Sequence, residues 1–155
     1  MNETEVYYLA NCEKDIISGK GKDILKAFGK EKFNLVDLGA GDALKTKILL
    51  KEALKEGYDF SYIAVDISDD SNKVLAENLK EVTENKLDMT IITGTFEEGS
   101  EWVAKNKTEK NVFLMLGNTM GNFENHEAVE YCKWLGSIMK KGDQFLFGLD
   151  LKKEP

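Results

Sequence analysis

Five short apolar runs, each separated from the next by an amphipathic stretch, constrain the fold of this chain more than any other feature. The runs at 33–38, 60–66, 87–93, 111–116 and 144–151 have the length and the content of β-branched and aromatic residues typical of buried strands. Strands that alternate with helices pair in parallel, and right-handed crossovers then place helices on both faces of one sheet. The sequence therefore predicts an α/β fold with a doubly wound parallel sheet in the order 3-2-1-4-5.

Helices are predicted where apolar residues recur at a spacing of three or four. Between the strands they are expected at 42–56, 69–82, 96–106 and 124–140. Asp42 and Ser68 are candidate N-caps for the first two. Ahead of the first strand, helices are expected at 7–18 and 22–28, interrupted by Gly19 and Gly21. The expected apolar faces carry residues at helical spacing: Leu9, Cys12 and Ile16, then Val74, Leu75, Leu79 and Val82, and finally Ala128, Cys132, Leu135 and Met139.

The composition narrows the functional class. A length of 155 residues fits one domain, 1–155, with a helical segment at 1–30 and the sheet-forming core at 31–155. A formal net charge of −7 without a basic stripe argues against nucleic-acid binding. No apolar run approaches the ~20 residues that span a bilayer, and no signal peptide is recognisable, so we expect a cytoplasmic protein. The spacing of Cys12, Cys132 and His126 does not fit a metal site, so no metal is expected. We expect both cysteines to be free thiols and His126 to lie at the surface.

The first strand ends in a glycine-rich turn that leads directly into a helix. Gly39 lets the backbone turn sharply, and Gly41 leaves room for a ligand to approach the main chain beside Ala40. Free N–H groups at the start of the helix can donate to that ligand. Asp66 ends the second strand, where an acidic side chain can accept hydrogen bonds from both ribose hydroxyls. Both NAD and S-adenosylmethionine use this geometry. The alternatives without a ligand are a plain strand–helix turn at the glycines and a helix-capping role for Asp66.

Asp42 and Leu44, which follow the glycine turn, favour S-adenosylmethionine over NAD as the ligand. The dinucleotide fingerprint has a third small residue where Leu44 stands. The carboxylate of Asp42 would face a pyrophosphate at the helix N-terminus, which is a contact between like charges. S-adenosylmethionine has no phosphate, and its sulfonium and ammonium groups tolerate a carboxylate. An NAD(P)-binding oxidoreductase domain is the alternative.

Two further turns are expected at the same edge of the sheet. Thr95 and Phe96 follow Gly94 after the third strand, where they can offer a hydroxyl and an apolar surface to an adenine ring. The loop at 117–123 follows the fourth strand, and its two glycines and two asparagines exceed what a plain connection needs. We expect the methyl acceptor at this loop.

Several stretches of the chain resemble the histidine-specific, S-adenosylmethionine-dependent methyltransferase family. The similarity is carried by 117–123 (GNTMGNF) and 141–153 (KGDQFLFGLDLKK), and it extends to 36–42 (VDLGAGD) and to the N-terminal 6–9 (VYYL) with Glu13. The best-known members trimethylate the α-amino group of histidine in ergothioneine biosynthesis. The resemblance implies a Rossmann-like class I methyltransferase fold.

The resemblance also implies roles for individual residues in cofactor binding. Gly39 and Lys45 would bind the methionine end of S-adenosylmethionine, and Asp66 would hold its ribose. Thr95 and Phe96 would flank the adenine. Gly117 also counts among the expected cofactor-binding residues.

On the substrate side, the resemblance implies that Tyr7 contacts an amino acid and that Asn122 holds its amine. We expect in-line attack of the neutral amine on the sulfonium methyl, with no general base among these residues. The family has an aspartate where Thr95 stands and an arginine where Asn11 stands. Family members also carry a further substrate-binding domain, so we expect this chain to bind the cofactor without a complete acceptor site.

A third possibility is a non-catalytic module that binds S-adenosylmethionine or a protein partner. A fifth strand at the edge of the sheet would offer unpaired backbone groups, which is a route to self-association.

Overall fold

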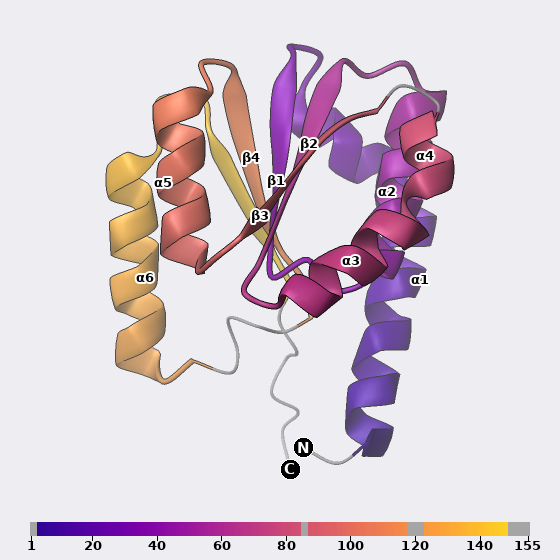
Figure 1. Ribbon diagram of the computed structural model, residues 1–155, viewed down its shortest axis with the longest axis horizontal. Coiled ribbons are helices and arrows are strands. Elements are labelled where there is room, and N and C mark those ends of the chain that lie inside the picture. Colours follow the sequence, from indigo (N-terminus) through magenta and orange to yellow (C-terminus); the bar gives the residue numbers. More distant parts are fainter. Residues whose placement is uncertain (1–2, 85–86, 118–122, 149–155) are drawn as a thin grey trace.

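The computed structural model describes residues 3–84, 87–117 and 123–148, with side chains from residue 13 onward. Figure 1 shows one sheet with helices on both of its faces. In chain order the elements are α1 (Glu3–Phe28), β1 (Phe33–Leu38), α2 (Leu44–Lys55), β2 (Phe60–Asp66), α3 (Asp69–Asn78), α4 (Lys80–Glu84), β3 (Asp88–Thr93), α5 (Phe96–Asn106), β4 (Lys110–Met115), α6 (Asn125–Ile138) and β5 (Gln144–Phe147).

The strands form one parallel sheet in the order β3-β2-β1-β4-β5, which confirms the predicted topology. All six residues of the central strand β1 are buried, because both faces of the sheet are covered. In the register, Leu38 pairs with Val65, and Asp66 pairs with Thr93. The carboxyl ends of the strands therefore meet at one edge, where the predicted site residues follow them.

The two faces of the sheet bury separate cores. Side chains such as Leu35 and Tyr62 pack against α1, α2, α3 and α4. The alternate residues Val36 and Ile63 point to the opposite face, where they pack with Tyr131 and other residues of α5 and α6. Figure 1 shows the same division, with α5 and α6 on one side of the sheet and the other helices opposite.

The N-terminal segment forms one continuous helix, so the predicted interruption at Gly19 and Gly21 is wrong. Each glycine inside a helix costs about 1 kcal/mol relative to alanine. Ile17, Leu25 and Phe28 are nevertheless buried at helical spacing on the face that packs on the sheet and α2, and this packing outweighs the glycine cost. Gly21 is buried against α2, and a Cβ there would make an ordinary contact, 3.8 Å from Cγ of Glu52.

Other local predictions also need correction. Ala43 and not Asp42 is the N-cap of α2, whereas Ser68 caps α3 as predicted. The helix expected at 69–82 divides at Leu79 into α3 and α4. The expected apolar faces are confirmed in part. Leu75, Leu79, Val82 and Leu135 are buried as predicted, whereas three other predicted members are exposed to solvent: Ile16, Val74 and Cys132.

The boundaries of the later elements shift slightly from the predicted ones. Strands β3 and β4 each begin within one residue of their predicted start, and α6 is shorter at both ends. Strand β5 ends at Phe147, and 149–151 lie outside the described residues. Across the described ranges, no helix is both long and apolar enough to cross a membrane. Strand β5 lies at one edge of the sheet, and self-association through it stays a prediction.

Candidate functional site

The turn after β1 has the backbone conformation that its glycines predict. Gly39 has φ of +73° and Gly41 has φ of +57°, both in the left-handed region that glycine adopts without strain. The N–H groups of Gly39 and Ala40 both donate to the carbonyl of Val65, at 2.8 and 3.2 Å. These bonds fix the turn against the end of β2. Ala43 also has positive φ, +61°, and this non-glycine residue marks the turn as a constrained segment.

Asp66 lies beside this turn and is held by the backbone on both sides. Its Oδ2 accepts the N–H of Gly41 at 3.0 Å, and its Oδ1 accepts the N–H of Ser68 at 2.9 Å. Each carboxylate oxygen has a further lone pair, so the side chain can still accept hydrogen bonds from a ligand. The structure therefore brings Asp66 and the glycine turn together, as the sequence predicts.

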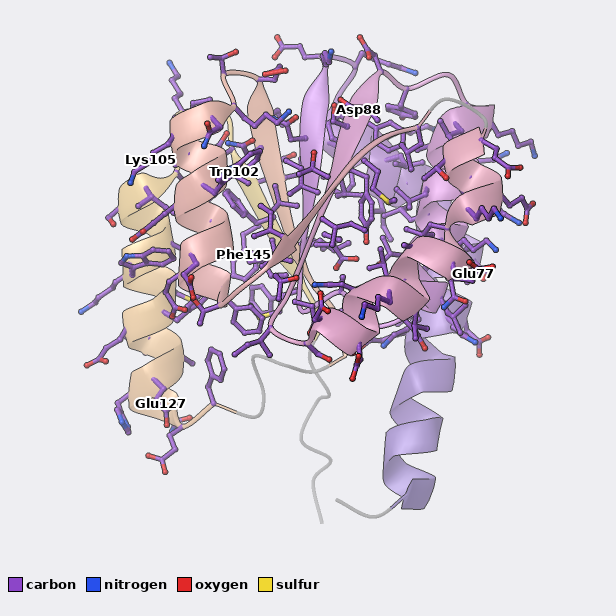
Figure 2. The ribbon with its side chains drawn as sticks, viewed as in Figure 1. Glu77, Asp88, Trp102, Lys105, Glu127 and Phe145 are labelled. Atoms are coloured by element: carbon purple, nitrogen blue, oxygen red, sulfur yellow. The ribbon has the colours of Figure 1, made fainter. Side chains whose placement is uncertain are left out.

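Two hollows open at this edge of the sheet, and both are lined by Gly39. The smaller, of about 310 Å³, lies along the glycine turn, the first turn of α2 and Gly117. The larger, of about 440 Å³, is lined by Asp66, Thr95 and Phe96, and by Glu127 from the first turn of α6. Figure 2 shows Glu127 at the start of this helix. An elongated ligand that passes Gly39 would occupy both hollows.

Space for a side chain at Gly39 is tight, and its backbone conformation favours glycine. A Cβ at this position would lie 3.2 Å from Cε1 of Phe96, so a larger residue would crowd the ring that lines the larger hollow. Phe96 in turn packs edge-on against Tyr131, with ring centroids 6.2 Å apart. Tyr131 was not among the predicted site residues, and its burial against Phe96 gives it a supporting role.

Thr95 has a structural role that was not predicted, although a glutamate three residues after it is the sequence signature of that role. Its Oγ1 accepts the N–H of Glu98 at 3.1 Å, and Oε1 of Glu98 accepts the N–H of Thr95 at 3.2 Å. This reciprocal pair is a capping box that begins α5. The Thr95 hydroxyl keeps its own proton for donation, so a contact with a ligand stays a prediction.

The first turn of α2 is poorly suited to a phosphate. Oδ1 of Asp42 accepts the N–H of Leu44 at 3.0 Å, and this N–H is one of the helix-start donors that a bound anion would use. The carboxylate also places negative charge at the position of that anion. This observation favours a ligand without a phosphate.

Lys45 lines the smaller hollow and is held by a residue from α1. Its Nζ lies 3.1 Å from Oε2 of Glu13. The same carboxylate accepts the N–H of Gly117, which follows β4, at 3.0 and 2.9 Å to its two oxygens. The structure thus joins Lys45 and Gly117 through Glu13. Glu13 was not among the predicted site residues, and its place in a stretch that resembles the family was its only signal.

A buried carboxylate supports the floor of the smaller hollow. Asp37 on β1 accepts hydrogen bonds at Oδ2 from Thr46 Oγ1 at 2.7 Å and from Tyr62 Oη at 2.6 Å. Burial raises the pKa of Asp37, although the two hydrogen bonds and the nearby Lys45 oppose this change. Burial and the Asp37 charge raise the pKa of Tyr62, so its hydroxyl stays a donor.

The acceptor residues lie outside what the structure describes. The backbone of Tyr7 belongs to α1, but its side chain is not among those described. Asn122 falls in the segment 118–122, outside the described residues. Their predicted roles stay predictions.

One exposed cluster near the start of α6 was not expected from the sequence. Ligand-type atoms of Glu124, His126 and Glu127 lie within 4.8 Å of one another. The side chain of His126 is 68% exposed, which confirms its prediction as a surface histidine.

Comparison with known proteins decides between the candidate ligands. A sequence model described as "histidine-specific methyltransferase, SAM-dependent" matches residues 1–155. The chain belongs to this family. The cofactor of the family is S-adenosylmethionine, so the preference for it over NAD(P) is confirmed.

Two curated relatives in the comparison differ in the acceptor that they name. The histidine N-alpha-methyltransferase of Mycobacterium tuberculosis is 24% identical over 148 residues, covering 96% of this chain and 44% of the relative. The 4-dimethylallyltryptophan N-methyltransferase easF of Claviceps fusiformis is 28% identical over 157 residues, covering 96% of this chain and 44% of that relative. The chain therefore spans less than half the length of either relative.

A solved structure supports the fold. An S-adenosylmethionine-dependent methyltransferase from Clostridium acetobutylicum matches with a TM-score of 0.55 and 14% identity, covering 86% of this chain and 48% of the other. At this identity the likeness concerns the fold alone, and it confirms the Rossmann-like methyltransferase architecture.

Proposed function

We propose that this chain is the cofactor-binding domain, 1–155, of an S-adenosylmethionine-dependent methyltransferase that methylates the α-amino group of histidine or a related amino acid. The segment 1–30 would close the methionine end of the site, and the core at 31–155 would supply the rest. Tyr7 and Asn122 would contact the amino-acid acceptor.

The observation that carries the proposal is that two chemically different hollows share Gly39 in their lining. The larger has the acceptor Asp66 and the apolar ring of Phe96, which suit a ribose and an adenine. The smaller has the cation of Lys45 and several backbone groups, which suit the methionine end. The carboxylate of Asp42 at the helix start disfavours a diphosphate between them.

The chemistry of methyl transfer asks little of the protein beyond positioning. Bound S-adenosylmethionine supplies a methyl group already activated on a sulfonium. Asp66 and Phe96 would fix the adenosine, and Lys45 would fix the carboxylate of the methionine. Asn122 would accept a hydrogen bond from the neutral amine and so aim its lone pair at the methyl carbon.

Calorimetry with the chain tests the cofactor half of the proposal. S-adenosylhomocysteine should bind and NADH should not. Asp66→Ala should weaken S-adenosylhomocysteine by more than about 100-fold, because two hydrogen bonds to a charged acceptor are each worth about 1.5–3 kcal/mol.

Asp88→Ala is the matched control for this substitution. Asp88 begins β3 at the opposite end of the strands (Figure 2), and it also accepts a hydrogen bond, from Ser61 at 2.9 Å. This variant should keep the affinity of the wild type. Tight binding of NADH in place of S-adenosylhomocysteine would overturn the proposal.

A further inference from the structure

The ion pair between Glu13 and Lys45 joins two elements that are distant in sequence. Glu13 lies in the middle of α1, and Lys45 lies in the first turn of α2. Both side chains are partly shielded from solvent: Glu13 is 16% exposed and Lys45 is 23% exposed. Shielding makes the pair stronger than an exposed ion pair and makes its geometry more definite.

The carboxylate of Glu13 is fixed from more than one side. It accepts the N–H of Gly117 with both oxygens, and Gly148 packs so closely that a Cβ there would lie 3.0 Å from Oε1. Lys45 and Gly117 both line the smaller hollow. Glu13 itself lines a neighbouring hollow, which shares Leu116 with the smaller one, and its carboxylate places a fixed negative charge 3.1 Å from the Lys45 ammonium.

A cation and an anion at this separation match the head group of an amino acid. Lysine alone would attract any anion, whether a carboxylate or a phosphate. The adjacent Glu13 repels a ligand that carries only negative charge and attracts one that also carries an ammonium. Both the protein pair and the zwitterion have no net charge, so exchanging partners leaves no charge unpaired.

We propose that Glu13 and Lys45 act together as a receptor for the zwitterionic methionine end of the cofactor. On binding, Lys45 transfers its contact to the ligand carboxylate, and Glu13 transfers its own from Lys45 to the ligand ammonium. The hydrogen bond from Gly117 holds Glu13 in place during the exchange. This inference rests on the proposed function and adds a cofactor-binding residue to it.

Three ligands separate the head-group contacts from the rest of the site. S-adenosylhomocysteine carries both charges, its deaminated analogue keeps only the carboxylate, and 5′-methylthioadenosine has neither. In calorimetry the wild type should prefer S-adenosylhomocysteine to the deaminated analogue by about tenfold, as expected for a hydrogen bond between charged groups. Glu13→Gln should remove this preference and leave the affinity for 5′-methylthioadenosine within about twofold of the wild type.

Glu56→Gln is the matched control. Glu56, which follows α2, also pairs with α1, through Lys22 at 3.8 Å, but this pair lies at the surface and its lysine lines neither hollow, whereas Lys45 lines the smaller one. The control should keep the preference, and thermal melting should show that both variants are folded.

The outcomes distinguish this inference from the proposed function. If Glu13→Gln keeps the tenfold preference, the ammonium is bound by another group, such as Asp37, and the inference is wrong. If it weakens 5′-methylthioadenosine as much as S-adenosylhomocysteine, Glu13 acts only on the fold. Failure of the wild type to bind any of the three ligands would instead overturn the proposed function.

Discussion

Replacing Gly99 with alanine should destabilise the protein at the point where α5 meets the sheet. Gly99 is buried on α5. A Cβ there would lie 2.5 Å from Cγ1 and 2.6 Å from Cγ2 of Val65, whereas ordinary contacts begin at 3.4 Å. Val65 is fully buried, and its β-branched side chain has little rotamer freedom with which to yield. Either α5 or β2 must therefore move by about an ångström.

The magnitude follows from two opposing terms. Overpacking of this kind costs about 1–3 kcal/mol, and a conflict with two methyl groups of a stiff side chain belongs at the upper end. Alanine recovers about 1 kcal/mol of helix propensity. The net loss in the free energy of unfolding should be about 2 kcal/mol, or roughly 4–8 °C in the melting temperature of a chain of this size.

Urea unfolding followed by circular dichroism measures this loss, and a second glycine supplies the control. Gly19 is an exposed residue inside α1, and a Cβ there would have no heavy atom within 4 Å. Gly19→Ala should therefore stabilise the protein by about 0.5–1 kcal/mol. A Gly99→Ala variant as stable as the wild type would refute the reasoning, because it would mean that α5 moves off the sheet without cost.

Gly99→Ala should also weaken S-adenosylhomocysteine binding, because it displaces Val65, whose carbonyl anchors the turn at Gly39. Thr95→Ala should cost about 1 kcal/mol of stability through loss of the capping box, whereas Thr95→Ser should cost much less; thermal melting of the pair checks this. Burial raises the pKa of Asp37 above its ordinary value of 3.8, so the folded state keeps this proton to higher pH than the unfolded state. The contribution of the Asp37 proton to the free energy of unfolding is fully present below pH 3.8, and it is lost as the pH rises through the folded pKa. Asp37→Asn should thus gain stability relative to the wild type as the pH rises above 3.8 and through the folded pKa of Asp37. A difference in urea unfolding that stays constant with pH would contradict this.

The fold could be predicted largely from local patterns. Strands β1 and β2 begin and end where the apolar runs do, because interior strands of a parallel sheet are buried on both faces and read as continuous runs. The predicted break in α1 was wrong for a different reason. Gly21 disfavours helix locally, but it is buried against α2, and a sequence pattern does not report that contact.

The site residues that directly follow a strand could be predicted from the sequence. Gly39 and Asp66 follow directly from the rule that ligands bind beyond the carboxyl ends of parallel strands. Glu13 was not selected, because its role depends on a hydrogen bond to Gly117, 104 residues away, and on a charge in α2. Such long-range contacts leave no periodic or local signal in the sequence.

The two hydrogen bonds that Asp66 accepts have a consequence for how the site would respond to change. The carboxylate is oriented before any ligand arrives, so ribose recognition would require little loss of side-chain entropy. The same side chain ties the turn after β1 to the turn after β2. An evolutionary change at Asp66 would alter the ligand contact and the shape of the glycine turn in one step, which leaves few substitutions that preserve either.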